Sequence, residues 1–168
     1  ENALLKAALN RVAFFVLTTF SLIACAEPAN YAFITNQLSN DISVIDIDKQ
    51  VVVSTITAGK APAGVALSQD GQRVIVTNPD SQNISVFDAK QFTEISQIPV
   101  GQGPVGIATN HDGSIAYVAD WYEHKISVVD VDKQQIRQRI DVGKSPAGII
   151  YDEPRNRLYV ANRDDNTV

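Results

Sequence analysis

The chain has 168 residues, of which 45% are hydrophobic and 20% charged, as is ordinary for a folded globular domain. Fourteen basic and nineteen acidic side chains give a net charge of -5, and no run of Lys or Arg forms a basic stripe. This balance argues against nucleic acid as a main partner. Because Cys25 is the only cysteine, the chain forms no internal disulfide and contains no Cys-x-x-Cys-His haem attachment motif.

The N-terminal segment predicts export. Two basic residues precede an uncharged apolar run over residues 12–24, which has the charge order and length of a secretory signal rather than of a membrane span. We therefore expect residues 1–26 to be a signal peptide, and the protein to be periplasmic or anchored at the outer envelope of a bacterium. Two cleavage interpretations stay open. Residues 22–25 (LIAC) resemble a lipobox, which would place a lipid on Cys25 and attach the protein to a membrane, whereas residues 24–26 (ACA) fit ordinary signal peptidase.

A sequence unit recurs along the chain with a constant period of about 42 residues. The apolar runs YAFITN, RVIVTN, IAYVAD and RLYVAN end at Asn36, Asn78, Asp120 and Asn162. The runs DISVID, NISVFD and KISVVD follow the first three with the same spacing. A Gly-x-x-Pro-x-Gly linker also recurs, starting at Gly59, Gly101 and Gly143. Three markers in one register indicate a repeat architecture.

Each unit contains four short runs with the apolar pattern of β-strands, separated by turn residues. We expect strands near 31–36, 41–46, 51–58, 63–68, 73–78, 83–88, 94–100, 105–110, 115–120, 125–130, 136–142, 147–152 and 157–162. A four-stranded unit of about 40 residues is typical of a propeller blade. The sequence therefore predicts an all-β fold, a β-propeller of four-stranded blades.

The blade count predicts an incomplete ring. About 3.4 units are present, whereas roughly four to eight blades close a propeller. We expect the chain to be the N-terminal part of a longer protein, with the inner strand of the first blade supplied from the missing C-terminus. The expected domains are the signal peptide (1–26) and the repeats (27–168), divided into a partial blade (31–58), two blades (63–100 and 105–142) and a partial blade (147–168).

The motifs VIVTN, AYVAD and LYVAN, with the GxxPxG linkers and the ISVID-like third strand, resemble the YVTN-type β-propeller repeat family. The resemblance covers residues 31–168. It implies an exported bacterial or archaeal surface protein. It also implies alternatives, since propellers of similar build serve as the heavy chain of quinoprotein amine dehydrogenase, as the haem-carrying domain of cytochrome-type nitrite reductases, and as lactonases. A quinone or haem cofactor is implied by family analogy alone, and the residues themselves indicate no cofactor.

The blade linkers and the turns between second and third strands of a propeller open on one face, which usually binds ligands. Only the turn over residues 120–125 combines aromatic and ionisable side chains, including the single tryptophan. We expect this turn to dominate a binding face. The candidate binding residues are Lys60, Asp120, Trp121, Tyr122, Glu123, His124, Lys144 and Arg163. In the alternative interpretation Trp121 folds back and caps its own blade.

Signs of catalysis are sparse. His111 and His124 are expected on opposite faces and therefore form no metal pair, and a GxSxG nucleophile motif is absent. Asp120 and His124 have the residue types of an acid/base dyad, but such a pair within a turn is more often simply solvated. The aspartates that close the third strands lack the closing Glu of a calcium loop, so we expect them to cap turns. They are Asp46, Asp88 and Asp130.

These features favour a non-catalytic exported propeller that binds or scaffolds a protein, a glycan or another envelope partner. The enzymatic alternative is a periplasmic quinoprotein or haem-associated oxidoreductase subunit, or a lactonase-like enzyme, with its catalytic residues in missing blades. A third hypothesis is a surface-layer component of the envelope.

Overall fold

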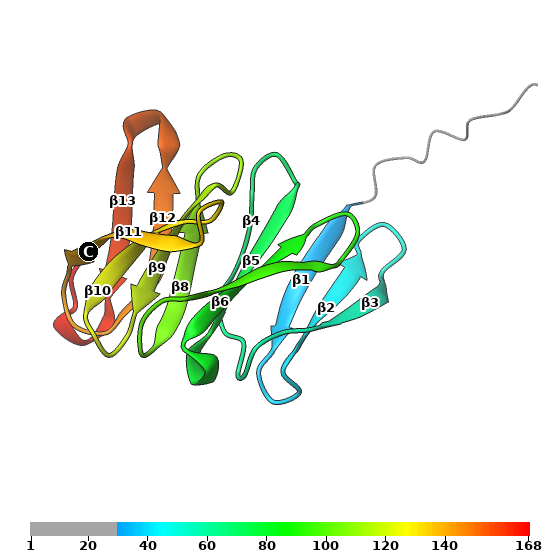
Figure 1. Ribbon diagram of the computed structural model, residues 1–168, viewed down its shortest axis with the longest axis horizontal. Helices are drawn as coiled ribbons and strands as arrows, with labels where there is room; N and C mark the ends of the chain where they lie inside the picture. The colour runs from blue at the N-terminus through cyan, green and yellow to red at the C-terminus, as the bar shows by residue number, and fades with distance from the viewer. Residues whose placement is uncertain (1–29) are drawn as a thin grey trace, which may run out of the picture.

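The computed structural model describes residues 30–168, and all thirteen expected strands are present there (Figure 1). Their ends differ from the expected ones by at most two residues. The strands are β1 (Tyr31–Asn36), β2 (Asp41–Asp46), β3 (Val51–Thr57), β4 (Val65–Leu67), β5 (Arg73–Asn78), β6 (Asn83–Asp88), β7 (Glu94–Pro99), β8 (Pro104–Thr109), β9 (Ile115–Asp120), β10 (Lys125–Asp130), β11 (Gln135–Asp141), β12 (Pro146–Asp152) and β13 (Arg157–Asn162). The short 3₁₀ turns are η1 (Pro79–Ser81), η2 (Glu153–Arg155) and η3 (Arg163–Asp165). The expected signal peptide and Cys25 lie outside the described residues.

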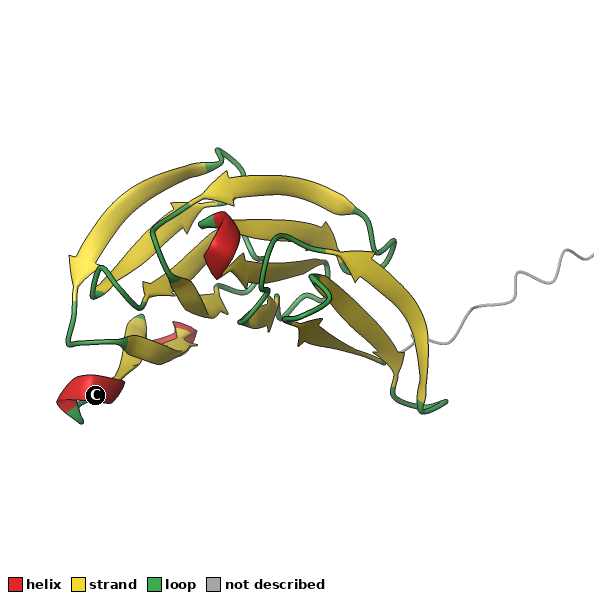
Figure 2. Cartoon of the chain, turned by 90° about the horizontal axis from the view of Figure 1, so that it is seen from below, coloured by secondary structure: helices red, strands yellow, loops and turns green. Residues whose placement is uncertain are grey.

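The strands form four antiparallel sheets that follow one another along the chain. Their strand orders are β1-β2-β3, β4-β5-β6-β7, β8-β9-β10-β11 and β12-β13. Seen from below the view of Figure 1, the sheets follow an arc, and residues 30–168 leave this arc open (Figure 2). The predicted fold class is therefore confirmed as a partial β-propeller. No helix in the described part of the chain is long and apolar enough to cross a membrane.

One irregularity recurs in the outer strand of each of the first three sheets. The pairing register shifts between Val44 and Ile45, between Val86 and Phe87, and between Val128 and Val129, which are equivalent positions of the repeat. In each sheet one residue of the outer strand has no partner, as in a β-bulge, which increases the local twist. The same bulge at equivalent positions shows that the blades are copies of one structural unit.

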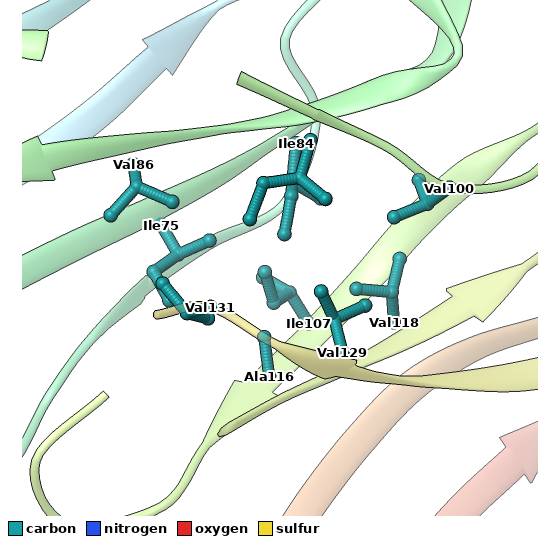
Figure 3. Packing of buried hydrophobic residues seen from close by; sticks show 10 residues of the cluster. Ile75, Ile84, Val86, Val100, Ile107, Ala116, Val118, Val129 and Val131 are labelled. Atoms are coloured by element: carbon teal, nitrogen blue, oxygen red, sulfur yellow. The ribbon is translucent and has the colours of Figure 1, made fainter. Parts of the chain in front are cut away.

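The hydrophobic core lies between consecutive sheets (Figure 3). Strands alternate inward and outward side chains, so each sheet presents apolar residues to its neighbours. The cluster between the second and third sheets consists of Ile75, Ile84, Val86, Ile98, Val100, Ile107, Ala116, Val118, Val129 and Val131. Full burial of one such aliphatic side chain contributes about 1.5–3 kcal/mol. Packing between blades is thus the main source of stability.

The innermost strands of neighbouring sheets approach closely. A Cβ atom at Gly106 would overlap the carbonyl oxygen of Ala147 in the next sheet, so only glycine permits this approach. The hydroxyl of Thr77 donates a hydrogen bond to the carbonyl oxygen of Val105 in the following blade, at 2.9 Å. Thr35, one repeat earlier, donates to the Ala63 carbonyl at 2.8 Å. These bonds add a polar tie to the hydrophobic contact between blades.

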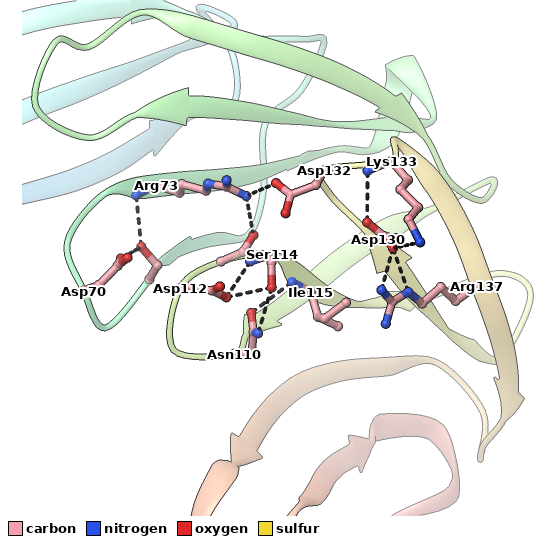
Figure 4. Close-up of polar contacts among 12 residues, drawn as sticks. Asp70, Arg73, Asn110, Asp112, Ser114, Ile115, Asp130, Asp132, Lys133 and Arg137 are labelled. Carbon is pink, nitrogen blue, oxygen red and sulfur yellow. Dashed lines mark hydrogen bonds and ion pairs between the residues drawn. The ribbon is translucent and has the colours of Figure 1, made fainter.

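Aspartates at the ends of the third strands cap the following turns, as the sequence predicts. Asp130 accepts a hydrogen bond from the backbone N–H of Lys133 at 2.9 Å and also binds the guanidinium of Arg137 (Figure 4). Asp46 and Asp88 accept backbone N–H groups in the same way. Figure 4 also shows Arg73 reaching from the second blade to Asp132 of the third.

Candidate binding face

The structure brings the blade linkers and the turns between second and third strands together at one edge of the sheets (Figure 1). The N–H of Ala61 donates to Asn40 Oδ1 in the preceding turn at 2.8 Å, and the N–H of Lys60 donates to Ser81 Oγ in the following turn at 2.7 Å. Each linker residue thus engages the turn of a different blade. These hydrogen bonds hold the turns in fixed positions at this edge of the sheets.

The linker between the third and fourth blades is held in the same manner. The N–H of Ser145 donates to Nδ1 of His124 at 3.1 Å, while the N–H of Lys144 donates to Asp165 Oδ2 at 2.6 Å. The Ser145 hydroxyl donates to Asp164. Backbone amides and turn side chains therefore form the frame of the face, and the Lys144 side chain extends from it as an exposed group.

The Asp120 side chain binds the backbone of the candidate turn, residues 120–125, and of the preceding linker. Its side chain is buried, with the residue only 2% exposed. One carboxylate oxygen accepts the N–H groups of Tyr122 and Glu123, at 3.0 and 2.8 Å, and the other accepts the N–H of Gly103 at 3.1 Å. The buried Asp120 carboxylate therefore orients the backbone of the turn, and its part in binding stays a prediction.

His124 occupies the left-handed position of the turn, with φ of 56°. The equivalent positions of the other turns, Asn40, Gln82 and Asn166, also have positive φ. Among the described residues no hydrogen bond joins the imidazole to the Asp120 carboxylate, since both side chains are engaged elsewhere. The Asp120 and His124 side chains therefore do not form the hydrogen-bonded pair that an acid/base dyad requires.

Trp121 contacts the next blade. The guanidinium carbon of Arg163 lies 5.3 Å from the centroid of the Trp121 ring, within the range of a cation–π interaction. The two residues are one repeat apart and occupy the same place in consecutive turns. Trp121 is half-buried, whereas the Arg163 side chain is 70% exposed. The ring thus lies at the junction of two blades.

Tyr122 is the most exposed aromatic side chain of the turn, at 68%. Its ring lies against the linker at Gly103, where a Cβ atom would overlap the ring carbon Cδ2. The equivalent linker positions are Ala61 and Ser145, so glycine occurs where the ring needs space. One side of the ring faces the linker and most of its surface faces solvent.

The remaining candidates have different surroundings. Glu123 forms an ion pair with Arg139 at 2.7 Å, and Arg139 also donates to the carbonyl oxygen of Val100. Lys60 is exposed in the linker between the first two blades. Within residues 30–168 no hydrogen bond or ion pair connects Lys60 with the turn that contains Trp121. The face therefore contains the Trp121–Arg163 contact at the junction of the third and fourth blades, Tyr122 on the linker between the second and third blades, and a separate lysine.

The two histidines lie at opposite ends of β9, as the sequence predicts. His111 precedes the strand and its Nδ1 is 3.1 Å from Gln69 Oε1, whereas His124 follows the strand. In the part of the chain that the structure describes, no group of three or more His, Cys, Asp or Glu side chains is placed to hold a metal ion.

Sequence reasoning missed Gly103, Ser145 and Arg139 as parts of the face. Gly103 and Ser145 belong to linkers whose glycines and prolines have a structural explanation, and Arg139 belongs to an outer strand. One feature of the sequence could have predicted the contact between blades. Arg163 occupies, in the fourth repeat, the position that Trp121 occupies in the third. Because equivalent turns are neighbours in a propeller, such pairs are expected to meet.

The repeated sheets, the inter-sheet core and the clustered turns define a β-propeller. Residues 20–113 match the family model described as "YNCE-like beta-propeller". The chain belongs to this family.

A comparison with curated proteins finds no significant match. Among solved structures, the chain is similar to Kuenenia stuttgartiensis hydrazine synthase, with 28% identity and a TM-score of 0.72 over 79% of this chain and 38% of that chain. Dihydro-heme d1 dehydrogenase NirN in complex with DHE is similar at 18% identity and a TM-score of 0.68, over 83% of this chain and 31% of that one. U3-55K matches at 11% identity and a TM-score of 0.65, over 79% of this chain and 48% of that one. The chain therefore spans less than half of each of these proteins, and the likeness to the last two shows the fold alone.

Proposed function

We propose that this protein is an exported, non-catalytic β-propeller that acts as a binding or scaffolding component of the bacterial cell envelope. The observation that supports this function best is the cluster at the junction of the third and fourth blades. There Trp121 and Arg163 lie on a frame of linker and turn hydrogen bonds, and the exposed Tyr122, next to Trp121 in the chain, packs on the preceding linker at Gly103. Exposed aromatic and arginine side chains on a rigid frame are typical of binding hot spots.

The proposal is tested by measuring the affinity with which envelope fractions bind the full-length protein. The double variant Trp121→Ala, Tyr122→Ala is expected to lower the affinity at least about 30-fold, since a hot-spot aromatic contributes about 2 kcal/mol or more. Leu38→Ala is a matched control, because Leu38 occupies the position of Tyr122 in the first turn and is 99% exposed. Unchanged capture by the double variant, or an equal loss in Leu38→Ala, would contradict the proposal.

Thermal unfolding separates binding from blade packing. If the double variant keeps full capture and loses several degrees of thermal stability, the aromatic residues serve the contact between blades only. If it loses capture and keeps its melting temperature within about 2 °C, the binding role is supported.

The similarity to hydrazine synthase, at 28% identity, favours a second candidate function. In this candidate the chain is part of a periplasmic haem- or quinone-associated oxidoreductase subunit, with its catalytic residues in further blades. The absorption spectrum of full-length protein purified from its native host distinguishes the two candidates, because haem and quinone cofactors absorb visible or near-ultraviolet light. A stoichiometric cofactor band would favour the oxidoreductase, and its absence after haem supplementation would favour the binding protein.

We extend the proposal to three finer points: the repeats are of the YVTN type, residues 1–26 direct export, and Cys25 carries a lipid. Labelling cells with a clickable fatty acid tests the lipid, with Cys25→Ser as the control. Label on the wild type that disappears in Cys25→Ser is expected. An unlabelled wild type, or label that persists in the variant, would favour ordinary cleavage after Ala26.

A further inference from the structure

The outer strand of the first sheet has one edge without a partner strand. β3 pairs with β2 on one side, and within residues 30–168 no strand pairs with its other side (Figure 1). The N–H of Ala58, directly after β3, donates to the carbonyl oxygen of Asn40 at 2.9 Å. Because the hydrogen-bonding direction alternates along an antiparallel strand, the backbone N–H and C=O groups of Thr55 and Thr57 point to the unpaired side. Such groups are suited to pairing with an added strand.

β3 lacks the residues that protect the equivalent outer strands. Its sequence, VVVSTIT, contains no charged residue and no proline, and its three valines are exposed. The equivalent strand β7 (EISQIP) begins with glutamate and ends with proline, while β11 (QIRQRID) contains two arginines and an aspartate. Charged residues and proline on an edge strand oppose its pairing with another chain. Of these three outer strands, β3 is therefore the one that is open to such pairing.

The exposure of Val53 is a property of its strand position and not of the open arc. Val53 is the extra residue of the bulge in β3, and Ile95 and Arg137 occupy the equivalent positions of β7 and β11. Ile95 is 56% exposed and the Arg137 side chain 50% exposed, although a blade lies on both sides of each of their sheets. A neighbouring blade would therefore leave Val53 exposed. The bulge limits regular pairing with an added strand to residues 54–57.

The charges that flank β3 have opposite signs at its two ends. Asp48 is exposed before the strand, and Lys60 is exposed after it. The other cation before the strand, Lys49, forms an ion pair with Asp46 at 2.6 Å. Antiparallel pairing of two copies of β3 would bring Asp48 of each copy towards Lys60 of the other, whereas parallel pairing would bring like charges together. The uncharged strand and its flanks are thus complementary to an antiparallel copy of themselves.

We propose that β3 pairs with β3 of a second copy of this chain, as antiparallel strands related by a two-fold axis. The same edge of both copies forms the contact, so the assembly closes as a dimer. One short strand from each copy gives a small interface, so we expect a weak, concentration-dependent dimer. This surface differs from the contact between Trp121 and Arg163, and the proposal does not depend on the proposed function.

Sedimentation equilibrium of the full-length protein at increasing concentration tests the dimer. All samples carry Cys25→Ser, so that a lipid does not contribute to association. The average mass is expected to rise from that of the monomer towards that of the dimer at concentrations up to about 1 mM, as for a small interface. A mass that stays at the monomer value would overturn the proposal. Growth beyond the dimer would also overturn it, because a two-fold contact closes.

The double variant Val53→Arg, Thr55→Arg tests whether β3 forms the interface. It places in β3 the two arginines that β11 contains at the equivalent positions, so the blade is expected to fold. We expect dimerisation at least about tenfold weaker, because the variant brings four arginines together at the contact. Ile95→Arg, Gln97→Arg is the matched control in β7 and should leave the dimer unchanged. Thermal unfolding verifies folding, and an unaffected dimer in the β3 variant, or an equal loss in the control, would contradict the proposal.

Charge reversal at the ends of β3 tests the orientation of the pair. Asp48→Lys is expected to weaken the dimer at least about threefold, since two attractive contacts become repulsive, and adding Lys60→Asp should restore it. Unchanged dimerisation of Asp48→Lys, or no restoration by the second change, would rule out antiparallel pairing. If the wild type is monomeric and Val53→Arg, Thr55→Arg instead loses capture by envelope fractions, the edge binds another protein and the dimer is wrong.

Discussion

His124 and Asn40, which lie two repeats apart, make the same contact in different blades. Nδ1 of His124 accepts the N–H of Ser145 at 3.1 Å, and Oδ1 of Asn40 accepts the N–H of Ala61 at 2.8 Å. The imidazole therefore replaces a carboxamide as the acceptor for a linker amide. This contact gives His124 a structural role in the frame of the face.

The first prediction concerns this replacement. His124→Asn is expected to keep the free energy of unfolding or raise it slightly, because asparagine retains the acceptor and tolerates positive φ. His124→Ala is expected to lower it by about 0.5–1.5 kcal/mol, because the Ser145 amide loses its partner. Urea denaturation of both variants is the measurement. Equal stabilities of the two variants would show that the contact contributes nothing.

The second prediction concerns the tie between blades made by Thr77. Its buried hydroxyl donates to the Val105 carbonyl and accepts the N–H of Gly64 at 2.8 Å. Thr77→Val keeps the shape and leaves both groups unpaired, so we expect a loss of about 1–3 kcal/mol in the free energy of unfolding. Thr35→Val is the matched control and should cost less, because Thr35 is half-buried. A smaller loss for Thr77→Val than for Thr35→Val in urea denaturation would contradict this account.

The strand positions could be predicted from the sequence because each blade repeats the same apolar alternation in one register. The constant repeat spacing also predicts which turns are neighbours, and so which face contains Trp121 and Arg163. The arrangement of the individual side chains could not be predicted in this way. The ring position of Tyr122 depends on Gly103 in the preceding linker, and the burial of Asp120 depends on which backbone amides turn towards it. Such contacts depend on the local path of the linker, which a repeat pattern does not describe.

The third prediction is a pH dependence of stability. Hydrogen bonds from the Lys133 backbone N–H, and then from Arg137, hold the pKa of Asp130 below its ordinary value of 3.8. A carboxyl group whose pKa is lowered by folding stabilises the protein above its unfolded pKa, and this contribution disappears as the pH falls through the folded pKa.

Asp130→Asn tests this dependence, because asparagine keeps an acceptor for the Lys133 amide and removes the charge. The wild type should be more stable than the variant at neutral pH, and the difference should shrink as the pH falls below about 4. Denaturation midpoints measured between neutral and acidic pH give the result. Asp80→Asn, at an exposed turn position, is the control and should show little difference at any pH. A stability difference for Asp130→Asn that stays constant with pH would contradict the assignment.

The last prediction concerns the coupling of Tyr122 to Gly103. A methyl group at position 103 would overlap the Tyr122 ring, and because this ring is 68% exposed it can swing outward at little cost. Gly103→Ala should therefore leave the melting temperature nearly unchanged and weaken ligand capture about as much as Tyr122→Ala does. Since both variants remove the same supported ring surface, their effects should not add, and the double variant should resemble either single one. Leu38→Ala, at the exposed position of the first turn that is equivalent to Tyr122, is the control and should leave capture unchanged. Additive losses in the Gly103→Ala, Tyr122→Ala cycle, measured as capture affinities, would show that the linker and the ring act on binding independently.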